Sequence, residues 1–347
     1  MAEIKPFKAV RPTRDKVSLM ASRSYDSYTP EQREARLKDN PFSFLHVVNP
    51  GYKYSQIIEG EKRYNLVRNR YQEFKEDGVL IKEQTPCYYI YKIVNHDAEV
   101  FNGIIAAAST QDYEKDIIKK HEDTLEYKEE IFVKYLKTVG FNAEPVLLTY
   151  PDNDALAGII SSVMQTRAEY EFTTTHRDTH YLWPLSETQI VSEISEIFKQ
   201  MPKLYIADGH HRSSSSCLLA QQLAQENNNH TLKDPYNYFM SFLIPESDLK
   251  IFEFNRLIKD LNGLSKEAFL IRLDFSFRIE NRGQNFYKPT KKHHFSMYLD
   301  GDFYSLYLRK DTYEINNALQ ALDTQILYKL IFEPILGIKD LRNDTRI

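Results

Sequence analysis

Four ionisable side chains stand together in one short stretch of the chain, namely Asp208, His210, His211 and Arg212. An apolar run over residues 203–207 precedes them and predicts a short strand. A turn that holds so many ionisable groups is costly to bury unless they have partners or a ligand. This stretch is therefore the first candidate for a site that performs chemistry.

The turn after this strand is predicted to lead into the start of a helix. Gly209 tolerates the backbone angles of a tight turn, and residues 213–216, all serine, then lead into a helix over 217–225. The first amides of a helix have no partners within it and carry partial positive charge, so this layout suits an anion. The structural alternative is that Asp208 bonds to nearby amides and that the serines are a capping region.

Two further clusters of polar residues are also candidates for a functional site. His121, Glu122, Asp123 and Thr124 close the charged segment 111–124, where charge pattern alone favours a surface carboxylate for Glu122. A second group, His176, Asp178 and His180, alternates along an expected strand and would share one face of it. We expect that face to be solvated rather than to bind a metal.

The composition limits the class of protein. The chain has 347 residues, is 27% charged and 42% hydrophobic, and carries a net charge of −4, which is ordinary for a soluble globular protein. This balance argues against a general nucleic-acid coat. The start has no apolar signal segment, and no apolar run approaches the roughly 18 residues of a membrane span. We therefore expect no membrane partner.

The two cysteines, Cys87 and Cys217, have no metal-type spacing and predict a reducing, cytoplasmic setting. Cys217 has two interpretations. A thiol at a helix start has a lowered pKa, whereas a buried thiol is inert. The second interpretation is favoured.

Helix and strand patterns alternate irregularly along the chain, with hairpins between them. The pattern predicts helices over 60–78, 126–140, 152–167 and 186–201, strands over 44–48, 145–150, 236–245 and 251–257, and hairpins over 87–108 and 293–308. This mixture favours an α+β fold with mixed sheets and flanking helices. We divide it into an N-terminal α+β region (1–110), a central region (111–226), to which the resemblance described below assigns the catalytic core, and a C-terminal α+β region (227–347). The natural chain is expected to continue beyond Ile347.

An ordered set of short motifs resembles a bacterial domain-of-unknown-function family over nearly the whole chain. The motifs are Lys5-Pro6-Phe7, Ala9-Val10-Arg11-Pro12, Tyr25-Asp26, Asn40 to Val47, Ile118 to Thr124, Ala207 to Arg212, Asn255-Arg256-Leu257 and Leu336-Gly337-Ile338. The His-Glu and Asp-Gly-His-His-Arg motifs are also similar to the ParB/sulfiredoxin-like superfamily, especially its free serine kinases. The resemblance implies a ParB/sulfiredoxin-like core around these two motifs.

Carried over to this sequence, the resemblance assigns roles to nine residues. Glu122 becomes the base that activates a serine hydroxyl, and Asp208 holds Mg²⁺ beside a phosphate. The implied catalytic residues are His121, Glu122, Asp208 and His210, and the implied phosphate and nucleotide contacts are Thr124, Gly209, His211, Arg212 and Ser213. The implied cofactors are Mg²⁺ and ATP or ADP.

Two classes of function follow as expectations. The first is a nucleotide-dependent phosphotransferase that acts on free serine or phosphoserine, run either as a kinase or as a phosphoserine phosphatase in serine biosynthesis. The second is a ParB-like nucleotide-binding regulator without turnover of a small molecule. The net charge of −4 favours the first. No Walker-type, dinucleotide-binding or G-x-S-x-G motif is present. The sequence does not indicate an oligomeric state.

Overall fold

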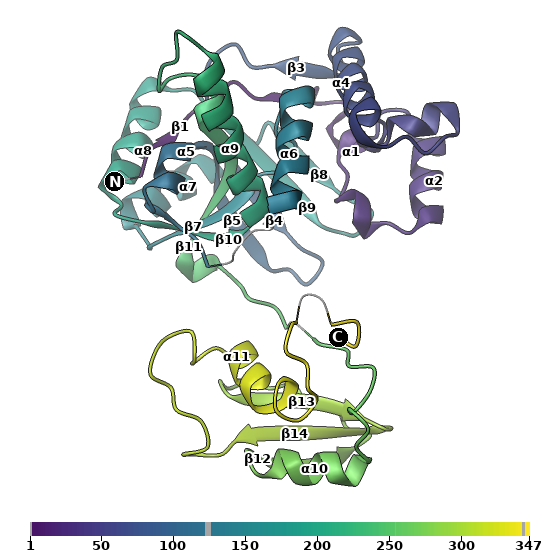
Figure 1. The fold of residues 1–347 in the computed structure, drawn as a ribbon. Coiled ribbons are helices and arrows are strands. Elements are labelled where there is room, and N and C mark those ends of the chain that lie inside the picture. Colours follow the sequence, from purple (N-terminus) through teal and green to yellow (C-terminus); the bar gives the residue numbers. More distant parts are fainter. Residues whose placement is uncertain (1, 122–125, 254, 342–343) are drawn as a thin grey trace. The chain divides into compact units, whose positions relative to one another are not determined.

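The computed structural model describes residues 2–121, 126–253, 255–341 and 344–347, and it has the α+β fold that the sequence predicts (Figure 1). The chain divides into two compact units, Met1–Lys250 and Ile251–Ile347. Each unit has its own sheet and its own apolar core. No helix in the described ranges is both long and apolar enough to cross a membrane.

The first unit is built on a mixed sheet with the strand order β6-β10-β7-β11-β5-β4-β9-β8, and β1 pairs with β5. The strands are β1 (Ile4–Lys5), β4 (Tyr88–Val94), β5 (Val100–Ser109), β6 (Ile118–Lys119), β7 (Val146–Tyr150), β8 (Tyr170–Thr173), β9 (Thr179–Leu185), β10 (Leu204–Asp208) and β11 (Tyr238–Pro245). All three predicted regions, 1–110, 111–226 and 227–347, contribute strands to this sheet.

The predicted hairpin over 87–108 is confirmed as the antiparallel pair β4–β5, with Tyr89 opposite Ile105 and Val94 opposite Val100. A short two-stranded ladder, β2 (Val10–Pro12) with β3 (Leu80–Lys82), lies outside the main sheet. The helices of this unit are α1 (Val17–Met20), α2 (Pro30–Asp39), α3 (Leu45–Val48), α4 (Gly60–Glu76), α5 (Thr110–Glu114), α6 (Glu126–Val139), α7 (Asp154–Met164), α8 (Thr188–Gln200) and α9 (His210–Glu226).

Burial of apolar side chains explains how α7 and α8 hold the sheet. Leu156 on α7 and Ile194 and Phe198 on α8 are fully buried and share one apolar cluster with strand residues such as Ile90 and Leu148. Burying a side chain of this size stabilises a fold by about 1.5–3 kcal/mol. The amphipathic patterns that predicted helices over 152–167 and 186–201 therefore correspond to these two buried helix faces.

The second unit has a three-stranded antiparallel sheet, β12 (Phe277–Gly283), β14 (Asp302–Leu308) and β13 (His294–Leu299), in that spatial order. The predicted hairpin over 293–308 is confirmed, and both Asp300 (φ 49°) and Gly301 (φ 89°) at its turn have the positive φ angles of an Asp-Gly hairpin loop. Helices α10 (Lys266–Asp274) and α11 (Asp323–Leu327) belong to this unit, and a π-helical turn, Tyr328–Phe332, continues α11.

Two predicted strands are wrong. Leu45–Val48 form helix α3, with Phe44 as its N-cap, and the amide of Leu45 donates to the Ser43 hydroxyl at 3.3 Å. A short apolar run has no periodicity that separates a strand from a buried helical turn. Residues 251–257 contain no strand at their described positions, where Ile251 and Leu257 are largely exposed. An apolar run without a neighbouring strand gains nothing from an extended conformation.

His180 on β9 gives the first unit a testable dependence on pH. Its ring is stacked on Phe172 and hydrogen-bonded through Nδ1 to the Tyr91 hydroxyl at 2.7 Å, and burial lowers its pKa. Because the unfolded chain then binds more protons than the folded one near the ordinary histidine pKa of 6.5, stability is lost as the pH falls through that value.

We expect the free energy of unfolding, measured in urea between about pH 7.5 and 5.5, to fall less steeply in His180→Phe than in the wild type. His176→Phe, at an exposed turn position, is the matched control and should keep the wild-type slope. Equal slopes for all three proteins would show that His180 does not contribute.

Candidate active site

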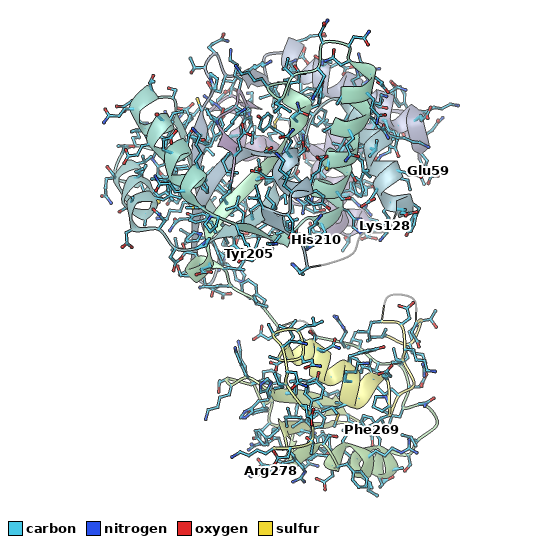
Figure 2. All side chains as sticks on the ribbon, turned by 60° about the vertical axis from the view of Figure 1, so that its left-hand side comes forward. Glu59, Lys128, Tyr205, His210, Phe269 and Arg278 are labelled. Carbon is cyan, nitrogen blue, oxygen red and sulfur yellow. The ribbon has the colours of Figure 1, made fainter. Side chains whose placement is uncertain are left out.

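The two polar motifs meet because strands β6 and β10 are parallel neighbours. Leu204 pairs with Ile118 and Tyr205 with Lys119, so the carboxyl ends of both strands lie at the same edge of the sheet. His121 follows β6, and Asp208 is the last residue of β10. In Figure 2, His210 lies at this border of the first unit, near Tyr205 of β10. Two motifs far apart in sequence are therefore adjacent in space.

Two backbone features shape the turn after β10. The register of β10 against β7 shifts between Ile206 and Asp208, an irregularity of the kind that redirects side chains at functional sites. Gly209 then takes φ 99° and ψ 33°, a left-handed conformation that disfavours any residue with a Cβ atom. A Cβ atom at this position would also lie only 3.1–3.2 Å from the Arg212 guanidinium.

Helix α9 begins at His210 and not at residue 217, so the prediction of a serine-rich approach to the helix is wrong. Serine favours caps and turns because its hydroxyl competes for backbone hydrogen bonds. Here the hydroxyls bond inside the helix instead. Ser213, Ser215 and Ser216 each donate to the carbonyl four residues earlier, and Ser214 donates to Glu129 on α6.

The early start of α9 places His210, His211 and Arg212 on its first turn. No side chain of the described residues caps this helix, so its first amides remain available for a ligand. Ser213, in contrast, is fully buried, and its hydroxyl donates to the carbonyls of Gly209 and His210. The Ser213 side chain is therefore inaccessible, and its hydroxyl is bound to the backbone of Gly209 and His210.

His121 and His210 form a direct pair at the junction of the two motifs. Their Nε2 atoms are 3.3 Å apart, and their rings meet edge to face with centroids 4.3 Å apart. His210 is only 6% exposed. A hydrogen bond between two ring nitrogens requires one to donate and the other to accept, so at least one of these two nitrogens carries no proton. Such a pair can accept or release a proton.

Arg212 connects the end of β10 with the residues that precede β7. One terminal nitrogen, Nη2, donates to Oδ2 of Asp208 at 2.5 Å, and the other, Nη1, donates to the carbonyl of Pro145. The carboxylate of Glu144 lies 3.8 Å from Nη1. The Asp208 side chain is itself 71% exposed. Arg212 therefore orients an accessible carboxylate beside the first turn of α9.

His211 stands next to this ion pair at the second position of the helix. Its Nδ1 atom is buried and forms no hydrogen bond with any residue the structure describes. Burying a nitrogen that has no hydrogen-bond partner destabilises the folded state, because the nitrogen loses its hydrogen bonds to water. A bound ligand is one explanation for such an atom. Of the predicted site residues, the structure thus groups His121, Asp208, Gly209, His210, His211 and Arg212. Glu122 and Thr124 lie outside the described residues.

The described residues of this turn offer one exposed carboxylate, that of Asp208, to the implied magnesium ion. No cluster of three or more His, Cys, Asp or Glu side chains arranged to hold a metal occurs within the described ranges. Mg²⁺ is commonly held by one or two carboxylates together with substrate phosphates and water. The exposed carboxylate of Asp208 meets that limited requirement.

The other polar groups of the sequence take structural roles. His180 bonds to Tyr91, and Asp178 accepts a hydrogen bond from the amide of His96, so His176, Asp178 and His180 do not converge. Cys217 is buried, and its thiol donates to Oε1 of Glu114 at 3.3 Å. Burial, together with Glu114, raises the Cys217 pKa to about 12, and the thiol is buried as the favoured interpretation expects.

The fold and the site together define an α+β protein with a polar site at the ends of two parallel strands and the start of a helix. A family model described as "Protein of unknown function (DUF1015)" matches residues 4–325. The chain belongs to this family, which confirms the prediction of a domain-of-unknown-function family. A search of curated proteins gave no match, and neither did a search of solved structures.

Gly209 offers a test of how tightly the turn is built. We expect Gly209→Ala to lower the free energy of unfolding by about 1–2 kcal/mol through backbone strain, with a further loss because the new methyl group displaces Arg212. Urea unfolding followed by circular dichroism measures the change.

Gly78→Ala is the matched control, because Gly78 also has a positive φ (68°) but a Cβ atom there would meet nothing within 4 Å. The loss at Gly209 should exceed the loss at Gly78. An equal or smaller loss at Gly209 would contradict the tight contact with Arg212.

Proposed function

We propose that this protein is a nucleotide-dependent phosphotransferase that acts on free serine or phosphoserine. The observation that supports this most directly is the contact between His121 and His210, which joins the two motifs at the first turn of α9. A motif pair that was only structural would not need to bring two imidazoles together beside an open helix start. The serine specificity comes from the resemblance of these motifs to free serine kinases.

The arrangement suits a reaction governed by charge. Phosphoryl transfer depends mainly on positioning and on neutralising charge on the phosphoryl oxygens. The first amides of α9 supply donors and the positive end of the helix dipole at no cost in buried charge. The amides of residues 210–212 would contact phosphate oxygens. Gly209 is required because a side chain there would intrude on Arg212.

The remaining residues would divide the other tasks. Glu122 would accept the proton of the serine hydroxyl, and Thr124 would contribute to phosphate binding from the same segment. The His121–His210 pair would deliver a proton to a bridging or leaving oxygen. Arg212 would exchange part of its contact with Asp208 for a phosphate oxygen. Asp208 would hold a hydrated Mg²⁺, which when bound would neutralise charge shared between phosphate groups.

The reaction has a direct test that covers both directions. The protein is incubated with phosphoserine, Mg²⁺ and ADP, and separately with serine, Mg²⁺ and ATP, while serine and phosphoserine are quantified by chromatography. We expect turnover in at least one mixture, with kcat reduced at least about 100-fold in His210→Gln and Glu122→Gln, since general acid–base catalysis contributes about 10²–10⁴-fold.

Arg212→Gln should mainly raise KM, since it removes a charge-assisted contact to phosphate. His176→Gln, at an exposed turn position away from the motifs, should leave both constants unchanged. Circular dichroism spectra establish that each variant is folded. A folded protein without turnover in either direction would overturn the proposal, and nucleotide binding without serine-dependent turnover would instead indicate a ParB-like regulator.

A further inference from the structure

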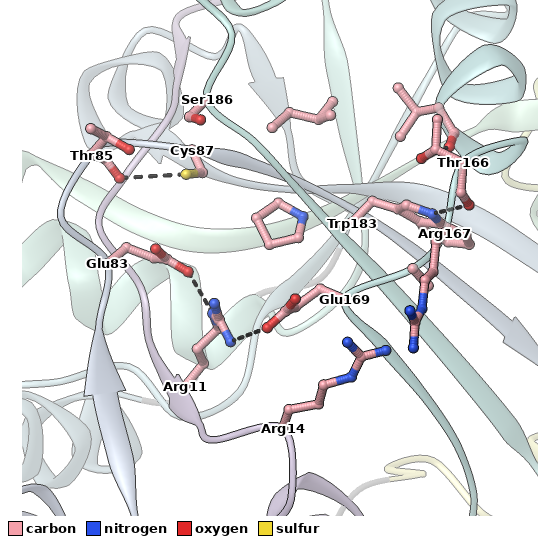
Figure 3. A pocket seen from close by; sticks show the side chains of 14 residues that line it. Arg11, Arg14, Glu83, Thr85, Cys87, Thr166, Arg167, Glu169, Trp183 and Ser186 are labelled. Atoms are coloured by element: carbon pink, nitrogen blue, oxygen red, sulfur yellow. Dashed lines mark hydrogen bonds and ion pairs between the residues drawn. The ribbon is translucent and has the colours of Figure 1, made fainter. Parts of the chain in front are cut away.

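Two adjoining pockets lie near strands β8 and β9 of the first unit, at the opposite end of the strand order from β6 and β10. The first, of about 410 Å³, is formed by Arg11 of β2, the segment that precedes β4, the end of β9 and the connection between α7 and β8 (Figure 3). The second, of about 480 Å³, is lined mainly by β8 and its neighbours. Both pockets share Arg14, Arg167 and Ala168. The two arginines thus stand where the pockets join.

The pockets belong to a different place in the fold from the paired histidines. β9, which lines the first pocket, is five steps from β10 in the strand order, with β7, β11, β5 and β4 between them. None of the residues that line either pocket comes from the segments 118–121 or 208–212. A ligand in these pockets would therefore bind independently of the proposed phosphotransferase site.

The three arginines of the first pocket differ in their partners. Arg11 forms ion pairs with Glu83 at 2.5 Å and Glu169 at 3.2 Å, and it also donates to the Tyr170 hydroxyl at 2.6 Å. The positive charge of Arg11 is therefore already compensated. Arg11 in turn holds the carboxylates of Glu83 and Glu169 in place (Figure 3).

Arg14 and Arg167, in contrast, are exposed and form no ion pair or hydrogen bond with any residue in the described ranges. Glu171 lines the second pocket but is not paired with either of them. Two neighbouring guanidinium groups repel each other. The chain has 49 acidic and 45 basic residues, so the absence of an ion pair at these two arginines, within the part of the chain that the structure describes, does not follow from a shortage of carboxylates. This arrangement favours an anionic ligand that neutralises both.

The chemistry of two guanidinium groups selects a phosphate over a carboxylate. Each group presents a planar fork of N–H donors that matches two oxygens of one anion. A phosphate monoester carries about −1.5 to −2 charges at neutral pH and three terminal oxygens, so it can engage both forks. A monocarboxylate has one charge and two oxygens, and one arginine already satisfies it.

The rest of the pocket suits the organic part of a small molecule. The indole of Trp183 is only 6% exposed, and its Nε1 donates to the carbonyl of Thr166 at 3.0 Å, so this wall is fixed in place. Val163 and Pro184 extend the apolar wall, while hydroxyls of Thr85 and Ser186 lie at the polar side. Ligand pockets commonly have volumes of about 300–1,000 Å³, and the first pocket falls within this range.

We propose that Arg14 and Arg167 bind the phosphate group of a small phosphorylated metabolite, whose organic part enters the pocket beside Trp183. This site is separate from the turn at 208–212, and its existence does not depend on the reaction proposed there.

The chain contains a single tryptophan, Trp183, so its fluorescence reports directly on the pocket. The emission of the protein is followed during titration with inorganic phosphate and with phosphoserine at constant ionic strength, and with acetate as the monocarboxylate probe. We expect a saturable change with both phosphate probes and a much weaker one with acetate. In the double variant Arg14→Gln, Arg167→Gln the affinity should fall at least about tenfold, because hydrogen bonds to charged groups are lost.

Arg68→Gln removes the same charge from an exposed position on α4 and is the matched control. His210→Gln shows whether the signal comes from the other site. Wild-type affinity in both control variants, with loss in the double variant, supports the proposal. A response that does not saturate, that is as strong with acetate, or that persists in the double variant would overturn it, whatever the outcome of the turnover assay.

Discussion

The parallel pairing of β6 with β10 is the constraint on which the candidate active site depends. Only two residue pairs form this ladder, yet it fixes the edge at which His121 and His210 meet. β7 pairs antiparallel with β10 on its other side, and Arg212 bonds across to the start of β7. Backbone pairing on both sides of β10 therefore holds the site in place. This pairing determines where the side chains of the site lie.

Helix α9 shows how a polar sequence becomes a buried element. Serines usually weaken a helix interior, but here three of them bond to carbonyls of their own helix and Ser214 bonds to Glu129 of α6. Their small size leaves room for α6 to pack closely, and each hydroxyl keeps a partner in the interior. The helix can thus carry a row of ionisable residues on its first turn while its next turn is fully buried.

Much of the fold was predictable from local patterns, and the failures have physical causes. The amphipathic period of residues 60–78 and the Asp-Gly turn at 300–301 are strong local signals, and both are confirmed. The strand predicted over 44–48 failed because five apolar residues fit a strand or a helical turn equally well. The start of α9 was missed because hydrogen bonds from serine to its own helix are invisible in a pattern. Arg14 and Arg167 carry no local signal at all, since only the folding of distant segments brings them to one pocket.

The ion pair and hydrogen bonds of Arg212 have a consequence for the energetics of the whole unit. They connect the end of β10 with residues 144–145, and β6 contributes His121 from a third segment, so the site exists only when these distant parts of the chain have assembled. A ligand that needs all three segments binds the folded state alone, and its binding free energy is then added to the stability of the fold. Binding of such a ligand at the turn and folding of the sheet edge are therefore thermodynamically linked.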